Sequence, residues 1–198
     1  MTLVGNAQKW QTLELSAGSM KYAFPASMFA GLFEAPIHPL VKVSGTYQWN
    51  KGDKHLLLQK VSAGYGYHRF LQSIIPINTS IGYRFQSGHL FAEAFLGAGY
   101  LHSVPTSPQF VLNNGVYEAT HKLGRAQMMF NLNLGIGYHL KKDTYIAVSY
   151  ENMLQSPFIK SYVPLLPYNI FNISYAFPMA TFKKLSNTEK AMKGTPKF

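Results

Sequence analysis

The chain has 198 residues, enough for one domain, and its 18 Lys and Arg against 8 Asp and Glu give a net charge of +10. Only 13% of the residues are charged while 15% are aromatic, so we expect part of the surface to face an apolar solvent. The basic residues gather on no single predicted face, which argues against nucleic-acid binding. Cysteine is absent, which excludes disulfides and thiolate metal sites.

Segments in which apolar and polar residues alternate follow one another along the chain. Between 73 and 86, for example, isoleucines and aromatics alternate with Asn78, Ser80 and Arg84. This pattern predicts eight strands, at about 10–20, 39–50, 55–69, 73–86, 89–103, 126–140, 144–154 and 168–177. Each strand is long enough to cross a bilayer at a tilt. Polar residues or glycine interrupt every apolar run well before the ~20 residues of a membrane helix. We therefore predict a closed antiparallel transmembrane β-barrel.

The connections differ in length. Three are short polar turns, at 50–53, 86–88 and 141–143, and three are long, at about 21–38, 104–125 and 155–167; the link at 70–72 is also short. Short periplasmic turns and long extracellular loops are typical of outer-membrane barrels, so we expect both chain ends on the periplasmic side. We divide the chain into a barrel at 1–177 and a basic periplasmic tail at 178–198. A soluble barrel of lipocalin type is the alternative, but it would need its apolar face inside and more charge.

With apolar residues facing lipid, the alternate residues fill the lumen, which in an eight-stranded barrel is only wide enough for side chains. Three acids and three bases fall on this inward face: Glu14, Lys42, Lys60, Arg84, Glu93 and Glu151. Buried charges are tolerable only when paired and hydrogen-bonded. We therefore predict a salt-bridged, filled lumen rather than a proton or ion path.

Some small outer-membrane barrels are enzymes, so we searched for their residue patterns. None of the seven histidines is followed by Ser two positions later, the spacing that places both on one face of a strand. Asp53 and Asp143 lie in predicted periplasmic turns, away from an extracellular active site. A set drawn from the loops, with His38, His121, Glu34, Glu118 and Ser103, stays open as an alternative. We predict no catalytic, cofactor-binding or metal-binding residue and no enzymatic function.

Two resemblances support the membrane interpretation. Residues 168–177 resemble the terminal-strand signal that the barrel-assembly machinery reads, although a 21-residue tail follows it. Residues 35–39, 90–102, 124–127 and 161–167 resemble a largely uncharacterised family of small outer-membrane barrels of Bacteroidota-type bacteria. This resemblance covers most of 30–177 and implies outer-membrane location with no catalytic residue to carry over. An outer-membrane protein also needs a secretory signal, so we expect the gene to encode a signal peptide before the mature chain.

The filled lumen and the missing enzyme patterns shift attention to the loops and the tail. We expect the tail to bind a partner through Phe182, Lys183, Lys184 and Phe198. The predicted function is an accessory or structural subunit of a larger outer-membrane complex for barrel assembly, protein export or nutrient uptake. The alternatives are a stand-alone barrel that stabilises the envelope or binds a ligand, and a lipid-modifying enzyme. The expected partners are outer-membrane lipids, lipopolysaccharide, and other outer-membrane or periplasmic proteins.

Overall fold

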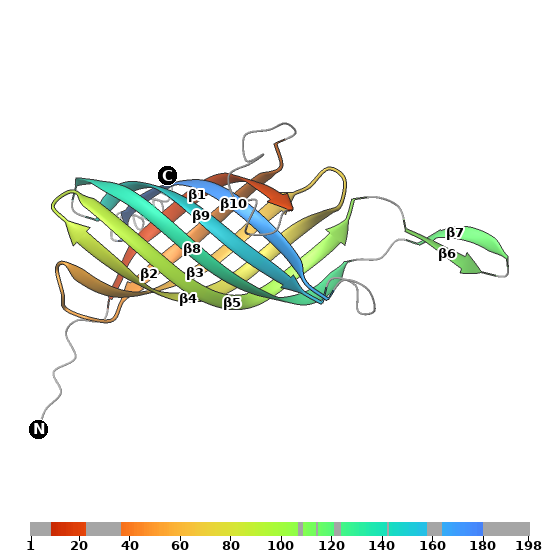
Figure 1. The fold of residues 1–198 in the computed structure, drawn as a ribbon, viewed down its shortest axis with the longest axis horizontal. Helices are drawn as coiled ribbons and strands as arrows, with labels where there is room; N and C mark the ends of the chain where they lie inside the picture. The colour runs from red at the N-terminus through yellow and green to blue at the C-terminus, as the bar shows by residue number, and fades with distance from the viewer. Residues whose placement is uncertain are drawn as a thin grey trace, which may run out of the picture.

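The computed structural model describes residues 9–22, 37–106, 109–113, 115–120, 124–141, 143–157 and 164–179, with the backbone alone at 9, 109–113 and 118–120. Eight strands form a closed barrel in the order β1-β10-β9-β8-β5-β4-β3-β2, and every neighbouring pair is antiparallel (Figure 1). The barrel strands are β1 (Lys9–Tyr22), β2 (Pro39–Gln48), β3 (His55–Tyr67), β4 (Gln72–Ser87), β5 (Leu90–Pro105), β8 (Arg125–Lys141), β9 (Thr144–Ser156) and β10 (Leu166–Pro178). The predicted eight-stranded fold is confirmed.

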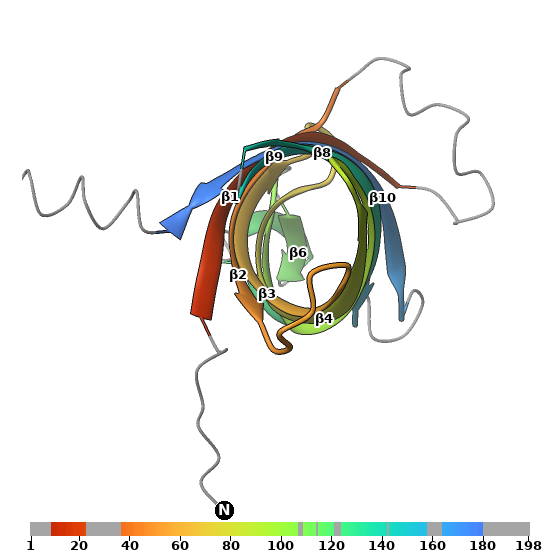
Figure 2. The ribbon, with the colours of Figure 1, turned by 90° about the vertical axis from the view of Figure 1, so that its left-hand side faces the viewer.

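The barrel closes where the first strand meets the last. Leu15 of β1 pairs with Val43 of β2 on one side and with Tyr175 of β10 on the other. Closure leaves no barrel strand with an unpaired edge, which is the condition for strands to lie in lipid. Viewed along its axis, the barrel is an oval ring of strands (Figure 2).

The two ends of the barrel differ, and we name them after their connections. At the turn end lie the connections 49–54, 88–89 and 142–143, and there Lys9 pairs with Gln48 and Thr12 with Pro178. Two of these turns use a left-handed backbone, at Gly88 (φ 60°) and Asp143 (φ 62°), and Asp is one of the few side chains that tolerate it. At the opposite end, which we call the loop end, β1, β3, β5 and β9 finish and β2, β4, β8 and β10 begin.

One element was not predicted. The connection between β5 and β8, expected as a plain loop, contains a hairpin of β6 (Gln109–Asn113) and β7 (Val116–Thr120), which projects beyond the loop end of the barrel (Figure 1). Two apolar runs flank Asn113, Asn114 and Gly115 in the sequence, which is a typical pattern for a hairpin. Gly115 has a φ of 82°, as such a turn requires. The prediction of a plain loop was therefore wrong at this point.

The outer face of the barrel is apolar. Leu96 is 69% exposed and Ile136 is 62% exposed, whereas inward residues on the same strands, such as Glu93 and Asn131, are buried. Aromatic side chains concentrate near the strand ends, as in membrane-interface belts. At the turn end Trp10 lies over Gly45, where a Cβ atom would stand 2.9 Å from the indole ring, and Trp10 also contacts Tyr47. No helix among the described residues is both long and apolar enough to cross a bilayer.

Candidate functional site: the filled lumen

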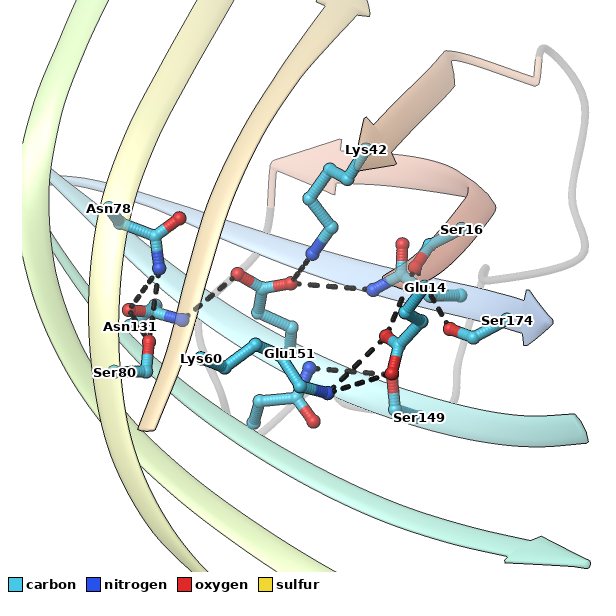
Figure 3. A network of polar contacts seen from close by, with 12 residues as sticks. Glu14, Ser16, Lys42, Lys60, Asn78, Ser80, Asn131, Ser149, Glu151 and Ser174 are labelled. Atoms are coloured by element: carbon cyan, nitrogen blue, oxygen red, sulfur yellow. Dashed lines mark hydrogen bonds and ion pairs between the residues drawn. The ribbon is translucent and has the colours of Figure 1, made fainter. Parts of the chain in front are cut away.

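The six charged residues singled out in the sequence all point into the barrel, each from a different strand. The Lys60 ammonium lies 3.1 Å from a carboxylate oxygen of Glu14 and 3.4 Å from one of Glu93. Arg84 donates to Glu93 from Nε at 2.8 Å and pairs with it again through Nη2 at 2.6 Å. Lys42 pairs with Glu151 in a second group (Figure 3). The structure thus brings the six together as two groups of paired charges.

Tyr145 joins the first group into one network. Its hydroxyl accepts a hydrogen bond from Arg84 at 2.9 Å and donates one to Glu14 at 2.8 Å. The Arg84 guanidinium also lies 4.2 Å from the centre of the Phe91 ring, and Lys60 lies 4.6 Å from that of Phe95, so ring faces cover both cations. Tyr145 was not predicted as part of the lumen. It lies an even number of residues before Glu151 on the same strand, so the alternating pattern did place it on the inward face.

Amides and hydroxyls satisfy the second group. The side chains of Asn131 and Asn172 donate to the two carboxylate oxygens of Glu151 at 3.2 and 3.3 Å, and Asn78 donates onward to Asn131 at 3.3 Å (Figure 3). A charged group that is paired and also hydrogen-bonded loses much less by burial than one that is only paired. These contacts account for a carboxylate that is 3% exposed.

Glycines on the inward face make the room that the large side chains fill. A Cβ at Gly82 would stand 2.2 Å from the ring of Phe95, and one at Gly137 would stand 2.2 Å from the ring of Phe91. With these rings in place, the central lumen keeps a cavity of about 20 Å³. That volume suits about one water molecule and no larger solute.

Toward the loop end the lumen changes character. An apolar plug fills it, formed by Met20, Leu40, Ile74, Leu101, Met129, Met153, Tyr168 and Ile170, each no more than 1% exposed. These residues share the inward parity of the charged set, but from the sequence only the charge network was predicted, and no apolar residue was named for the lumen. The interior of a small barrel must be filled by side chains of the right size, whether these are apolar or charged. Both kinds therefore occur at the inward positions of the same alternating pattern.

A polar layer covers the plug. Gln72 donates to the Gln155 side-chain oxygen at 2.7 Å and to the Tyr168 hydroxyl at 2.5 Å, and Gln155 in turn donates to Gln127 at 2.6 Å. Ser103 also donates to Gln127, at 2.6 Å. These side chains are buried, and their mutual bonds satisfy polar atoms that the apolar plug could not.

Beside this layer, at the loop end, the rings of His38 and His68 are stacked with centroids 3.5 Å apart and planes 20° from parallel. His38 directly precedes β2 and His68 directly follows β3, and both are buried. Tyr22 packs against His68 with a centroid distance of 4.3 Å. Burial, and next the neighbouring His38, lower the pKa of His68 to about 4; burial and nearby Lys21 lower the pKa of His38.

The predicted partner-binding tail, with Phe182, Lys183, Lys184 and Phe198, lies outside the described residues. The same is true of Glu34 and His121, and the side chain of Glu118 is also outside. Among the residues whose side chains are described, no group of three or more His, Asp or Glu could hold a metal ion.

No protein-family model matches the chain, and no curated protein matches it. Solved structures do match. Neisserial surface protein A covers 86% of this chain and 98% of its own length at 10% identity, with a TM-score of 0.60. The outer membrane enzyme PagL covers 85% and 99% at 10% identity, with a TM-score of 0.50. Ail of Yersinia pestis covers 86% and 99% at 11% identity, with a TM-score of 0.46.

The first two matches show the fold. The chain has the architecture of small eight-stranded outer-membrane barrels over the 85–86% of its length that these matches cover. At 10% identity they carry neither a site nor an activity across to this protein. The resemblance to barrels of Bacteroidota-type bacteria stays a prediction.

Proposed function

We propose that the protein is an integral outer-membrane barrel without enzymatic activity that serves as a structural or accessory subunit of a larger outer-membrane complex. The filled lumen carries this proposal. Two groups of paired charges, an apolar plug and a covering polar layer occupy the interior, so the described barrel offers no room to transport or process a solute. What remains for contact is the outer wall and the two ends.

The apolar outer wall supports the membrane part of the proposal, and the two unlike ends support its orientation. Lipids, lipopolysaccharide included, cover the wall, and the turn end faces the periplasm together with both chain ends. The predicted tail, from 178 to 198, would then meet periplasmic partners. At the opposite end the β6–β7 hairpin extends past the barrel, where Val116 is 63% exposed and Tyr117 is 71% exposed.

Crosslinking in native outer membranes tests the subunit role. The full chain should crosslink into a species well above its own 22.2 kDa, and the same species should survive extraction in mild detergent. Two variants locate the contact: one ends after Met179, and in the other a short Gly-Ser turn replaces 109–120. Loss of the large species in either variant supports the proposal. Migration of the full chain as a single barrel in both membranes and detergent would refute it.

A matched control separates contact from misfolding. Both variants should keep the resistance of a folded barrel to SDS at room temperature, because neither change touches the paired strands β1–β5 and β8–β10. If a variant loses that resistance, crosslinking is repeated with Val116→Ser and Tyr117→Ser, which leave the chain length unchanged.

A further inference from the structure

The stacked histidines at the loop end require that at least one ring be neutral. Their centroids are 3.5 Å apart, and two imidazolium rings at that distance would repel strongly in a buried setting. The Nδ1 atom of His68 also lies 3.4 Å from the backbone N–H of Phe70, which requires that this nitrogen accept and carry no proton. The geometry is therefore that of a pair in which His68 is neutral, and the lowered pKa of His38, caused by burial and by nearby Lys21, favours a neutral second ring as well.

The surroundings offer the pair no compensating negative charge among the described residues. The ionisable groups around it are Lys21 and Tyr22 of β1, Tyr168 of β10, and Arg69 in the turn that follows His68. The phenols are neutral at physiological pH and the other two groups are cations. Within the part of the chain that the structure describes, a proton added to either histidine would therefore meet a ring face, another imidazole or a positive charge.

The pair lies one layer outside the apolar plug. Leu40 of the plug is two residues after His38 on the inward face of β2, and Gly66 is two residues before His68 on β3. A Cβ at Gly66 would stand about 3 Å from Leu40, Ile74 and Met20, so plug and backbone are in tight contact here. The histidines and Tyr22 close this side of the mouth, with Phe70 edge-on to both imidazole rings.

We propose that His38 and His68 form an acid-sensitive latch: the neutral, stacked pair closes one side of the loop-end mouth beside the polar layer, and protonation separates the rings and exposes the adjoining part of the apolar plug at Leu40. The device needs only local movement. His38 directly precedes β2 and His68 begins the turn 68–71. Backbone hydrogen bonds hold both residues, from the Met20 N–H to the His38 carbonyl at 2.9 Å and from the His68 N–H to the Gln72 carbonyl at 3.1 Å, so opening is a movement of the two imidazole rings. The barrel wall and the charge network stay intact when the latch opens.

The sign of the pH dependence follows from linkage. Buried His68, with its pKa near 4, binds a proton less readily than an exposed histidine with a pKa near 6.5, so the open state binds more protons. The stability of the closed state relative to the open state is therefore greatest above about pH 6.5 and decreases as the pH falls toward about 4. From His68 alone the open-to-closed ratio rises by at most about 300-fold across this window.

A single cysteine reports the opening, because the natural chain has none. Leu40→Cys places a thiol in the plug, at a site 1% exposed, and Ser87→Cys places one at the exposed turn end as the reference. Both are treated with 2,2′-dithiodipyridine, which reacts with thiols in acid, and the Leu40→Cys rate is divided by the Ser87→Cys rate. We expect this ratio to rise at least tenfold between pH 7.5 and pH 4.5.

Histidine variants decide whether the latch causes the rise. The double variant with His38→Gln and His68→Gln should abolish the rise in the rate ratio. His55→Gln, at the turn end, should leave the rise unchanged. His68→Lys, which carries a permanent charge, should give a high ratio already at pH 7.5. A flat ratio with the natural histidines, or a rise that persists with both glutamines, would overturn the proposal.

NMR titration of histidine-labelled protein with no cysteine introduced gives an independent reading. Two ring signals that titrate well below the ordinary histidine pKa of about 6.5, together with a change in the Met20 methyl signal in the same pH range, support the latch. Two loop-end histidines that titrate as ordinary exposed ones would contradict it.

Discussion

The middle and the loop end of the lumen solve the same packing problem in opposite ways. In the middle, Glu93 is 6% exposed and is held by two cations, so the interior depends on charges that must all be present. At the loop end, Leu101 is fully buried among other apolar side chains and the two histidines are stacked without charge. One barrel therefore combines a section held by paired charges with a section held by apolar packing and an uncharged pair of rings, and the proposed latch places the response to protons in the second.

The largest expected effect comes from breaking the charged section. Glu93→Gln removes the carboxylate shared by Lys60 and Arg84, and leaves a buried cation without its partner. We expect a loss of about 3–5 kcal/mol in the free energy of unfolding. Urea unfolding of the barrel in phospholipid vesicles, followed by tryptophan fluorescence, measures it.

A second variant shows whether the cost is that of an unpaired charge. In the double variant Arg84→Gln, Glu93→Gln, the loss in the free energy of unfolding should be clearly smaller than the sum of the two single losses. The reason is that removing both partners leaves no unpaired charge in the lumen. Additive losses would mean that the pairing contributes little and that the central lumen is held by packing alone.

The next effect comes from the apolar section. Leu101→Ala should cost about 2–4 kcal/mol because it leaves a hole in a plug whose members are almost fully buried. The matched control is Ile136→Ala on the outer wall, where the side chain is 62% exposed in the chain alone. Lipid fills the space that the removed atoms leave there, so the loss lacks the contribution of a cavity and should be clearly smaller than at Leu101. Equal losses at the two positions would show that the plug is not packed as described.

A smaller effect tests the space that glycine leaves. Gly82→Val would drive its side chain into the ring of Phe95, which a Cβ already meets at 2.2 Å, at a cost of about 1–3 kcal/mol. Combining it with Phe95→Ala should recover only part of the loss, since the removed ring makes room while the Ala94 carbonyl oxygen, 2.4 Å from that Cβ, stays in place. Failure of the double variant to improve on Gly82→Val would place the strain in the backbone instead.

Much of the fold could be predicted, because the alternation of apolar and polar residues marks the strands and the lengths of the connections mark the two ends of the barrel. The eight predicted strands match the eight of the barrel to within a few residues at each end, and parity placed Glu14 and Arg84 inside. The pairing of Lys60 with both Glu14 and Glu93 could not be read, because cross-barrel contacts depend on strand stagger and tilt rather than on sequence spacing.

The loop end was the least predictable part for a related reason. His38 and His68 are 30 positions apart, and His38 lies outside the predicted strands although His68 falls within the one predicted at 55–69, so no periodic signal joins the two. The β6–β7 hairpin, by contrast, could have been predicted from the Asn-Gly dipeptide between its two strands. It was missed because long loops are usual at that end of an outer-membrane barrel.

The central claim is that the lumen is filled, and conductance across a planar bilayer tests it most directly. The purified chain should insert and give no conductance steps in 1 M KCl, since the central cavity of about 20 Å³ has no room for a hydrated ion. Steady open steps from the natural chain at neutral pH, altered in size by Glu93→Gln or Arg84→Gln, would show an ion path through the charge network and contradict the account.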